Sequence, residues 1–151
     1  MKRAIYLGIS LLLAFTPSAD AATNNISQSS VTSVELNQSA KAIRIVALAN
    51  GSAEIVSALG LRSSLVGRDI ASSTTELKNV PIVTSGHQVI AEKIIALKPD
   101  VVLVDASTGP KTALDTLKSA KIRLAKIPEA WTLSDIDLKI KAIGVAVLSP
   151  D

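Results

Sequence analysis

Short apolar runs alternate along the chain with longer segments in which apolar residues return every three or four positions. The apolar runs predict buried strands at 43–48, 65–67, 82–84, 101–104 and 122–127. The segments with helical spacing predict helices over 52–60, 91–97, 110–120 and from 133 onwards. This alternation of strands and helices is typical of an α/β fold built on a parallel, three-layer sheet.

Residues that favour helix ends lie near the predicted boundaries. Ser52 is predicted to cap the first helix, which Gly60 ends, and Thr132 is predicted to cap the last one. The last helix carries an apolar stripe that we expect to pack on the sheet, formed by Leu133, Ile136, Ile140, Ile143 and Val147. Trp131 lies directly before this helix, and we expect it to take part in local packing.

The first residues follow a different pattern from the rest. Lys2 and Arg3 precede an apolar run at 4–15, and small residues follow at 19 and 21. This pattern is typical of a secretory signal peptide, here over 1–21, and it is too short for a membrane span. The alternative is a buried N-terminal helix. No cysteine follows the run, so we expect a protein exported to the periplasm or the extracellular space without a lipid anchor.

The segment that follows, at 22–41, is rich in Ser, Thr, Asn and Gln. Such a composition offers too few apolar side chains to form a core. We therefore expect a flexible polar leader at 22–41 and the α/β lobe over 42–151.

The composition excludes several kinds of chemistry. One histidine and no cysteine exclude a cysteine nucleophile, a disulfide and a thiolate metal site. Aromatic residues make up 2% of the chain, and the net charge of +3 is scattered without a basic run, so nucleic acid is a poor fit as a partner. No Gly-x-Ser-x-Gly motif is present, and we assign no catalytic residue.

Ligands of parallel α/β sheets bind at the carboxyl edge, in the loops that follow the strands. Three predicted loops qualify, at 50–52, 85–88 and 107–109. The only histidine, His87, lies in the middle loop. A histidine in this position is either a ligand-binding group or an ordinary solvated side chain.

Residues 91–104, with the sequence AEKIIALKPDVVLV, resemble a motif of the iron–siderophore, cobalamin and heme receptors of bacterial ABC importers. The strand at 44–48 and the helix at 54–60 resemble the opening of the same family, and the resemblance extends over about 43–143. It implies the first half of a two-lobe, helical-backbone substrate-binding protein, with the ligand held between the lobes. The chain ends near the expected connecting helix. We therefore expect the first lobe alone, as a truncated or split receptor or as a stand-alone lobe.

Within that family, the loops at 85–88 and 105–110 resemble those of the heme receptors most. The resemblance implies that His87 is the axial ligand of the heme iron. It also implies that Ser107 and Thr108 contact the porphyrin edge or its propionates, next to the helix N-terminus at Pro110, which suits a carboxylate. The alternative for these two hydroxyls is ordinary helix capping.

Receptors of this family dock on their permease through one acidic residue in each lobe. Glu92 occupies the matching position, and Glu54 is a second candidate; the alternative for Glu92 is a first-turn glutamate favoured by the helix dipole. The resemblance thus implies a non-enzymatic binding protein that captures heme and delivers it to the permease subunits of an ABC importer. Other possibilities are a siderophore or cobalamin receptor lobe, an exported α/β enzyme using Asp69 and Asp105, or an interaction domain without a small ligand.

Overall fold

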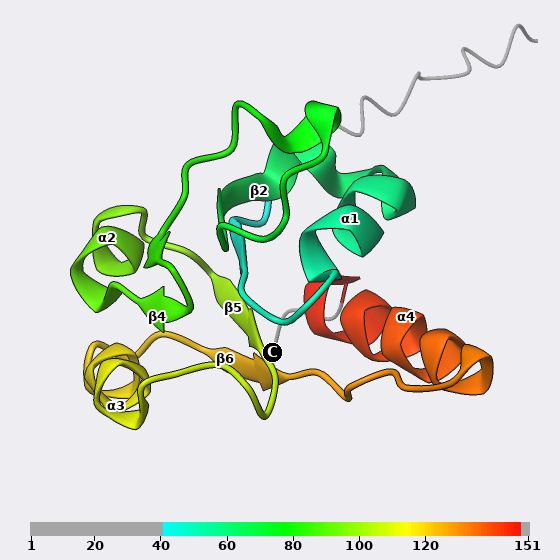
Figure 1. Cartoon of the computed structure of the whole chain (residues 1–151). Coiled ribbons are helices and arrows are strands. Elements are labelled where there is room, and N and C mark those ends of the chain that lie inside the picture. Colours follow the sequence, from blue (N-terminus) through cyan, green and yellow to red (C-terminus); the bar gives the residue numbers. More distant parts are fainter. Residues whose placement is uncertain (1–40, 149–151) are drawn as a thin grey trace, which may run out of the picture. The chain divides into compact units, whose positions relative to one another are not determined.

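The computed structural model describes residues 41–148 (Figure 1). The predicted signal peptide at 1–21 lies outside these residues, as do positions 22–40 of the predicted leader and residues 149–151. Within the described part of the chain, no helix is long and apolar enough to cross a membrane.

The main sheet has four parallel strands in the order β2-β1-β5-β6, and the predicted parallel α/β class is confirmed. These strands are β1 (Ile45–Ala47), β2 (Leu65–Arg68), β5 (Val101–Val104) and β6 (Leu124–Lys126). The two central strands, β1 and β5, are buried along their whole length. This burial explains why they appear in the sequence as continuous apolar runs without a polar alternation.

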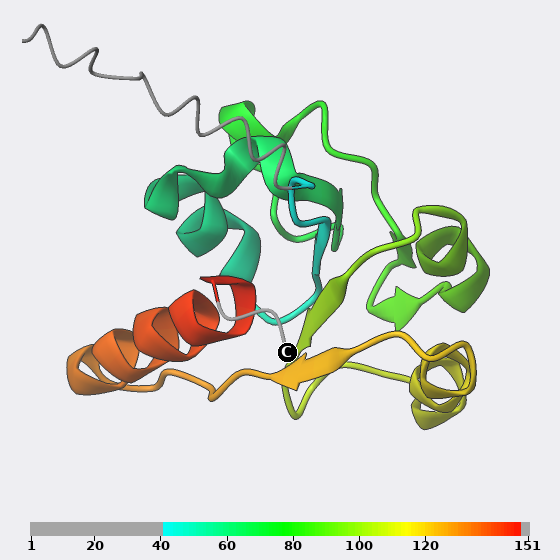
Figure 2. The same ribbon diagram turned by 180° about the vertical axis from the view of Figure 1, so that it is seen from behind.

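Helices cover both faces of the sheet, which gives the three predicted layers (Figures 1 and 2). One face carries α1 (Ser52–Val56) and α4 (Leu133–Leu148), and the other carries α2 (Ala91–Ala96) and α3 (Lys111–Ser119). Ile45 and Ala47 of β1 point into the core beneath α1 and α4, whereas Val46 points into the core beneath α2 and α3. The remaining helical turns are η1 (Ser57–Leu61), η2 (Arg62–Ser64) and η3 (Thr75–Leu77).

The predicted strand at 82–84 is replaced by a short antiparallel hairpin. Ile82 forms only an isolated parallel bridge with Arg68 of β2. The carbonyl of Val83 then accepts a hydrogen bond from the N–H of Ile90, at 3.0 Å, instead of one from β2. As a result, the chain leaves the main sheet and forms β3 (Thr84–Ser85) and β4 (Gln88–Val89).

The start of the first helical segment differs from the prediction, whereas Gly60 breaks this segment as predicted, within η1 and after α1 itself has ended at Val56. The N-cap residue is Gly51, with a φ of 66°, and not Ser52. Ser52 is the first residue of α1, and its buried hydroxyl donates a 2.6 Å hydrogen bond back to the carbonyl of Ala49. Gly60, with a φ of 81°, interrupts the helical turn of η1 and ends this segment, as predicted.

Only the C-terminal half of the apolar stripe on α4 packs on the sheet. Ile143 and Val147 are buried, but Leu133 is 86% exposed, and Ile136 and Ile140 are 41% and 37% exposed. The cause is the direction of α4, whose N-terminal half extends beyond the sheet (Figures 1 and 2). The expectation of local packing for Trp131 is wrong, because this side chain is 84% exposed.

Candidate ligand-binding site

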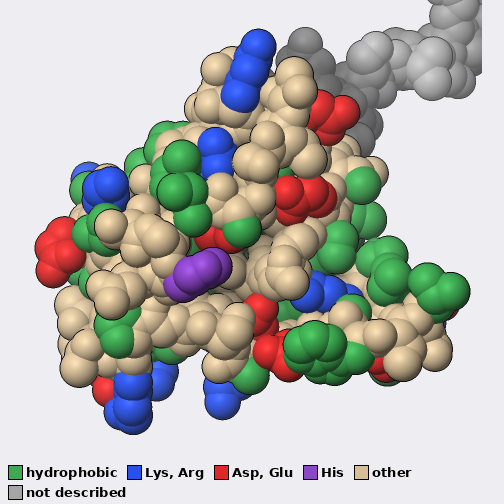
Figure 3. Space-filling model, viewed as in Figure 1, with side chains coloured by type: hydrophobic (Ala, Val, Ile, Leu, Met, Phe, Trp, Pro, Cys, Tyr) green, Lys and Arg blue, Asp and Glu red, His purple; other side chains and the backbone are tan. Residues whose placement is uncertain are grey.

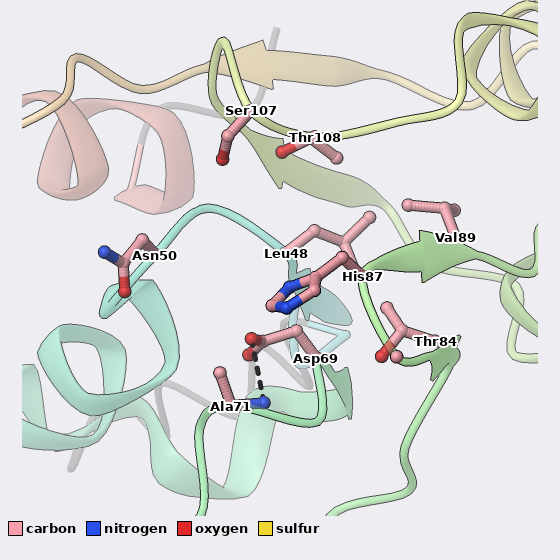
Figure 4. A pocket seen from close by; sticks show the side chains of 10 residues that line it. Leu48, Asn50, Asp69, Ala71, Thr84, His87, Val89, Ser107 and Thr108 are labelled. Atoms are coloured by element: carbon pink, nitrogen blue, oxygen red, sulfur yellow. Dashed lines mark hydrogen bonds between the residues drawn. The ribbon is translucent and has the colours of Figure 1, made fainter.

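A pocket of about 400 Å³ opens at the carboxyl edge of the sheet (Figure 4). Its walls come from the loops that follow β1, β2 and β5 and from the β3–β4 hairpin. The lining residues are Leu48, Asn50, Asp69, Ala71, Thr84, Gly86, His87, Val89, Ser107 and Thr108. The three predicted candidates His87, Ser107 and Thr108 therefore lie around one opening, and the volume is within the range of small-molecule sites.

His87 is presented by a two-residue hairpin turn. Gly86 occupies the first central position with a φ of 56°, which glycine adopts readily and which a type II′ turn needs there. The turn leaves the His87 side chain exposed in the middle of this face, with acidic and basic side chains scattered around it (Figure 3). An imidazole in this position is free to meet a ligand that enters the pocket.

The hairpin is tied to the loop that follows β5. The N–H of Val89 donates a 2.8 Å hydrogen bond to the carbonyl of Gly109, and Gln88 forms a parallel bridge with the same residue. This connection explains why His87 and Thr108, which are far apart in the sequence, line the same pocket.

Asp105 organises the loop behind the pocket. Its Oδ1 accepts hydrogen bonds from the Ser107 N–H at 3.1 Å and from the hydroxyls of Ser107 and Thr108 at 2.8 Å each. Its Oδ2 accepts the Asn50 N–H at 2.8 Å. Burial tends to raise the pKa of Asp105, but these hydrogen bonds outweigh burial and hold the pKa below its usual value. The carboxylate is therefore ionised near neutral pH and links the loops after β1 and β5.

The hydroxyls of Ser107 and Thr108 donate their protons to Asp105. They lie in the predicted place, but as donors they are already occupied within the loop. Contact of these two residues with a propionate stays a prediction.

Asp69 lines the pocket together with His87 (Figure 4). Its carboxylate accepts the N–H of Ala71 at 3.1 Å and the N–H of Ser72 at 3.3 Å. Such hydrogen bonds to the following backbone stabilise a turn. Asp69 and Asp105 are the two carboxylates of the alternative interpretation as an enzyme. Each accepts hydrogen bonds from residues of its own loop.

A single imidazole is the donor that an axial heme site requires, because the macrocycle supplies the four other nitrogen ligands. Among residues 41–148, no group of three His, Cys, Asp or Glu side chains could hold a metal ion. The role of His87 as an axial ligand stays a prediction.

The two predicted docking residues lie in the first turns of their helices. Glu92 is exposed in the first turn of α2. Glu54 is partly buried in α1, where it accepts a 3.1 Å hydrogen bond from the hydroxyl of Ser72. Glu92 is thus the more accessible of the two, and the docking role of both stays a prediction.

A second, smaller pocket of about 130 Å³ was not predicted. It is lined by Asn50, Asp105, Ser107, Glu129, Ala130, Trp131 and Lys139. The signal in the sequence was Lys139, a charged residue on the same side of α4 as the apolar stripe.

The parallel α/β fold thus has a ligand-sized pocket at the carboxyl edge of its sheet, the place where folds of this class bind their ligands. Residues 45–149 match the family model described as periplasmic binding protein, and the chain belongs to this family.

Two curated relatives illustrate the breadth of this family. The chain is 35% identical over 107 residues to the uncharacterized ABC transporter substrate-binding lipoprotein YvrC of Bacillus subtilis. This match covers 68% of this chain and 33% of that protein. It is 28% identical over 109 residues to the vitamin B12-binding protein of Pectobacterium carotovorum, covering 72% of this chain and 39% of the relative. The chain therefore spans between a third and two fifths of the length of these relatives.

Solved structures of heme-binding proteins share the fold. The heme binding protein HmuT matches with a TM-score of 0.65 and 28% identity, over 70% of this chain and 35% of that one. The periplasmic heme binding protein HutB of Vibrio cholerae matches with a TM-score of 0.62 and 29% identity, over 68% of this chain and 40% of that one. These similar proteins are binding proteins, not enzymes.

Proposed function

We propose that this chain is the heme-capturing lobe of a substrate-binding protein that serves a heme ABC importer. The observation that carries the proposal is His87, exposed on a hairpin at the rim of a pocket of about 400 Å³. The likeness to HmuT and HutB supports heme as the ligand. In this proposal no residue is catalytic, and the protein binds, carries and releases its ligand.

The proposed site acts through the side chains on its rim. His87 donates a nitrogen lone pair to the iron from one face of the macrocycle. Leu48 and Val89 supply apolar contacts from the pocket wall, and Asp105 keeps the loop that carries Ser107 and Thr108 in place. The opposite face of the macrocycle needs cover from a second surface, which the two-lobe architecture of the predicted family supplies.

A cobalamin ligand is the second candidate, because the vitamin B12-binding protein of Pectobacterium carotovorum matches over 72% of this chain. Equilibrium titrations distinguish the two candidate ligands. Binding is followed by the fluorescence of Trp131, the only tryptophan of the chain. Hemin, cyanocobalamin and ferrichrome are titrated in parallel. Saturable binding of hemin alone supports the proposal, whereas saturable binding of cyanocobalamin or ferrichrome with no response to hemin contradicts it.

We further propose export and cleavage of the chain, with residues 1–21 as the signal peptide, 22–41 as the leader and 42–151 as the N-terminal lobe. Expression of the full chain in a Gram-negative host tests this arrangement. The expected periplasmic product begins at Ala22. A cytoplasmic product that retains Lys2 and Arg3 would contradict it.

Docking on the permease is proposed to use Glu92, with Glu54 as a second contact. Glu92→Arg is expected to weaken association with a reconstituted heme-importer permease while leaving hemin binding intact, because an exposed acidic contact is replaced by a repelling charge. The matched control is Asp137→Arg, which changes an exposed acidic residue of a different helix, α4. Equal association of both variants would contradict the role of Glu92.

A further inference from the structure

Lys139 is a lysine whose side chain is largely buried in the described part of the chain. It lies on the inner side of α4 and is 6% exposed. Within residues 41–148, it forms neither a hydrogen bond nor an ion pair with any described residue. No fully buried side-chain nitrogen or oxygen of the described residues lacks a hydrogen-bond partner, so the Lys139 ammonium reaches solvent, and its donors are available to an acceptor that enters from outside.

Lys139 lines the smaller pocket of about 130 Å³, together with Asn50 and Ser107. These two residues also line the larger pocket that contains His87. The two pockets therefore share a wall, and a group attached to a ligand in the larger pocket can extend toward Lys139.

Two acidic residues line the smaller pocket, but neither is an acceptor for Lys139 in the structure. Asp105 already accepts four hydrogen bonds through its two oxygens, from Asn50, Ser107 and Thr108. Glu129 is partly exposed at the border of the pocket and forms no ion pair with Lys139. Lys139 is thus a largely buried member of this pocket whose ammonium donors are unused within the described residues.

We propose that Lys139 forms a carboxylate-binding subsite next to the main pocket, with the side-chain amide of Asn50 as a second donor. An ammonium group offers three donors and a full positive charge, and a carboxylate group is its natural complement. The identity of the carboxylate rests on the proposed function, under which it is a propionate of heme. The subsite itself does not depend on iron ligation by His87.

Sodium propionate is the direct probe of the subsite. The titration is followed by the ¹H–¹⁵N shifts of the Asn50 and Ser107 amides, with sodium chloride at equal ionic strength as the reference. A saturable shift is expected in the native protein and in Lys141→Met, a variant at an exposed lysine of the same helix, but not in Lys139→Met. An unchanged spectrum of the native protein, or an equal response of Lys139→Met, would overturn the proposal.

Hemin and hemin dimethyl ester, whose propionates are neutral, link the subsite to the transported ligand. The native protein and Lys141→Met are expected to bind hemin about tenfold more tightly than the ester, since a charge-assisted hydrogen bond is lost in the ester. Lys139→Met is expected to bind both porphyrins equally. Retention of the preference in Lys139→Met would contradict the subsite, because the lysine then has only a structural role.

The two experiments separate this proposal from the proposed function. Failure of both porphyrins to bind, with the propionate shift retained, would refute heme as the ligand and support the subsite. Binding of both porphyrins without a propionate shift and without a preference for hemin would support heme and refute the subsite. Far-ultraviolet circular dichroism of each variant establishes that Lys139→Met is folded, and Lys139→Arg, which keeps the charge, is expected to restore the propionate response in part.

Discussion

Asp105→Ala removes the group that holds together the loops after β1 and β5. The substitution takes away the acceptor of four hydrogen bonds, with donor–acceptor distances between 2.8 and 3.1 Å. Two of the four come from Ser107, which is exposed, so water can replace them at little cost. The other two come from the Asn50 N–H and the Thr108 hydroxyl. At about 1.5 kcal/mol for each hydrogen bond to a charged acceptor, their loss lowers the free energy of unfolding by about 3 kcal/mol.

Urea denaturation followed by circular dichroism measures this change. Asp115→Ala is the matched control, because Asp115 also accepts hydrogen bonds, here from Lys111 and Lys118, but its side chain on α3 is 43% exposed. The control is expected to leave the denaturation midpoint nearly unchanged, since exposed ion pairs contribute little. A loss below about 1 kcal/mol for Asp105→Ala, or an equal effect in both variants, would refute the reasoning that these hydrogen bonds organise the site.

Three further predictions concern acid stability, the hairpin and the core. The pKa of Asp105 is lowered in the folded protein, so the ionised carboxylate contributes its full stabilisation above the unfolded pKa of about 3.9. This stabilisation is lost as the pH falls through the folded pKa. Urea midpoints at successively lower pH are therefore expected to fall less steeply in Asp105→Ala than in the native protein. Gly86→Ala is expected to cost about 1 kcal/mol in urea denaturation, because alanine is strained at a φ of 56°. Leu117→Ala, at a fully buried side chain of α3, is expected to cost about 2–5 kcal/mol in the same assay.

The fold was predictable where local sequence and burial agree. β1 and β5 are buried on both faces, so each is a continuous apolar run, and α2 and α3 repeat apolar residues at helical spacing. The spacing of apolar residues, however, does not predict how far the sheet extends beneath a helix. The stripe on α4 was predicted correctly as a stripe, but its N-terminal half extends beyond the sheet and leaves Leu133 exposed.

The candidate site was predictable in its location but not in its hydrogen bonds. Placing His87, Ser107 and Thr108 in loops at the carboxyl edge required only the order of strands and helices. The β3–β4 hairpin depends on the bond between Ile90 and Val83, which competes with pairing to β2 and leaves no local signal. Lys139 is remote from the three loops in the sequence, and only the packing of α4 brings it to the pocket wall.

The central claim is that His87 binds the iron of heme, and the absorption spectrum of the hemin complex tests it most directly. Purified protein is titrated with hemin and compared with His87→Ala and with His87→Tyr, which offers a phenolate ligand to iron. The account predicts a saturable Soret shift in the native protein, its loss in His87→Ala and a different, ligated spectrum in His87→Tyr. A Soret shift of the same position and affinity in the native protein and in His87→Ala would contradict the account.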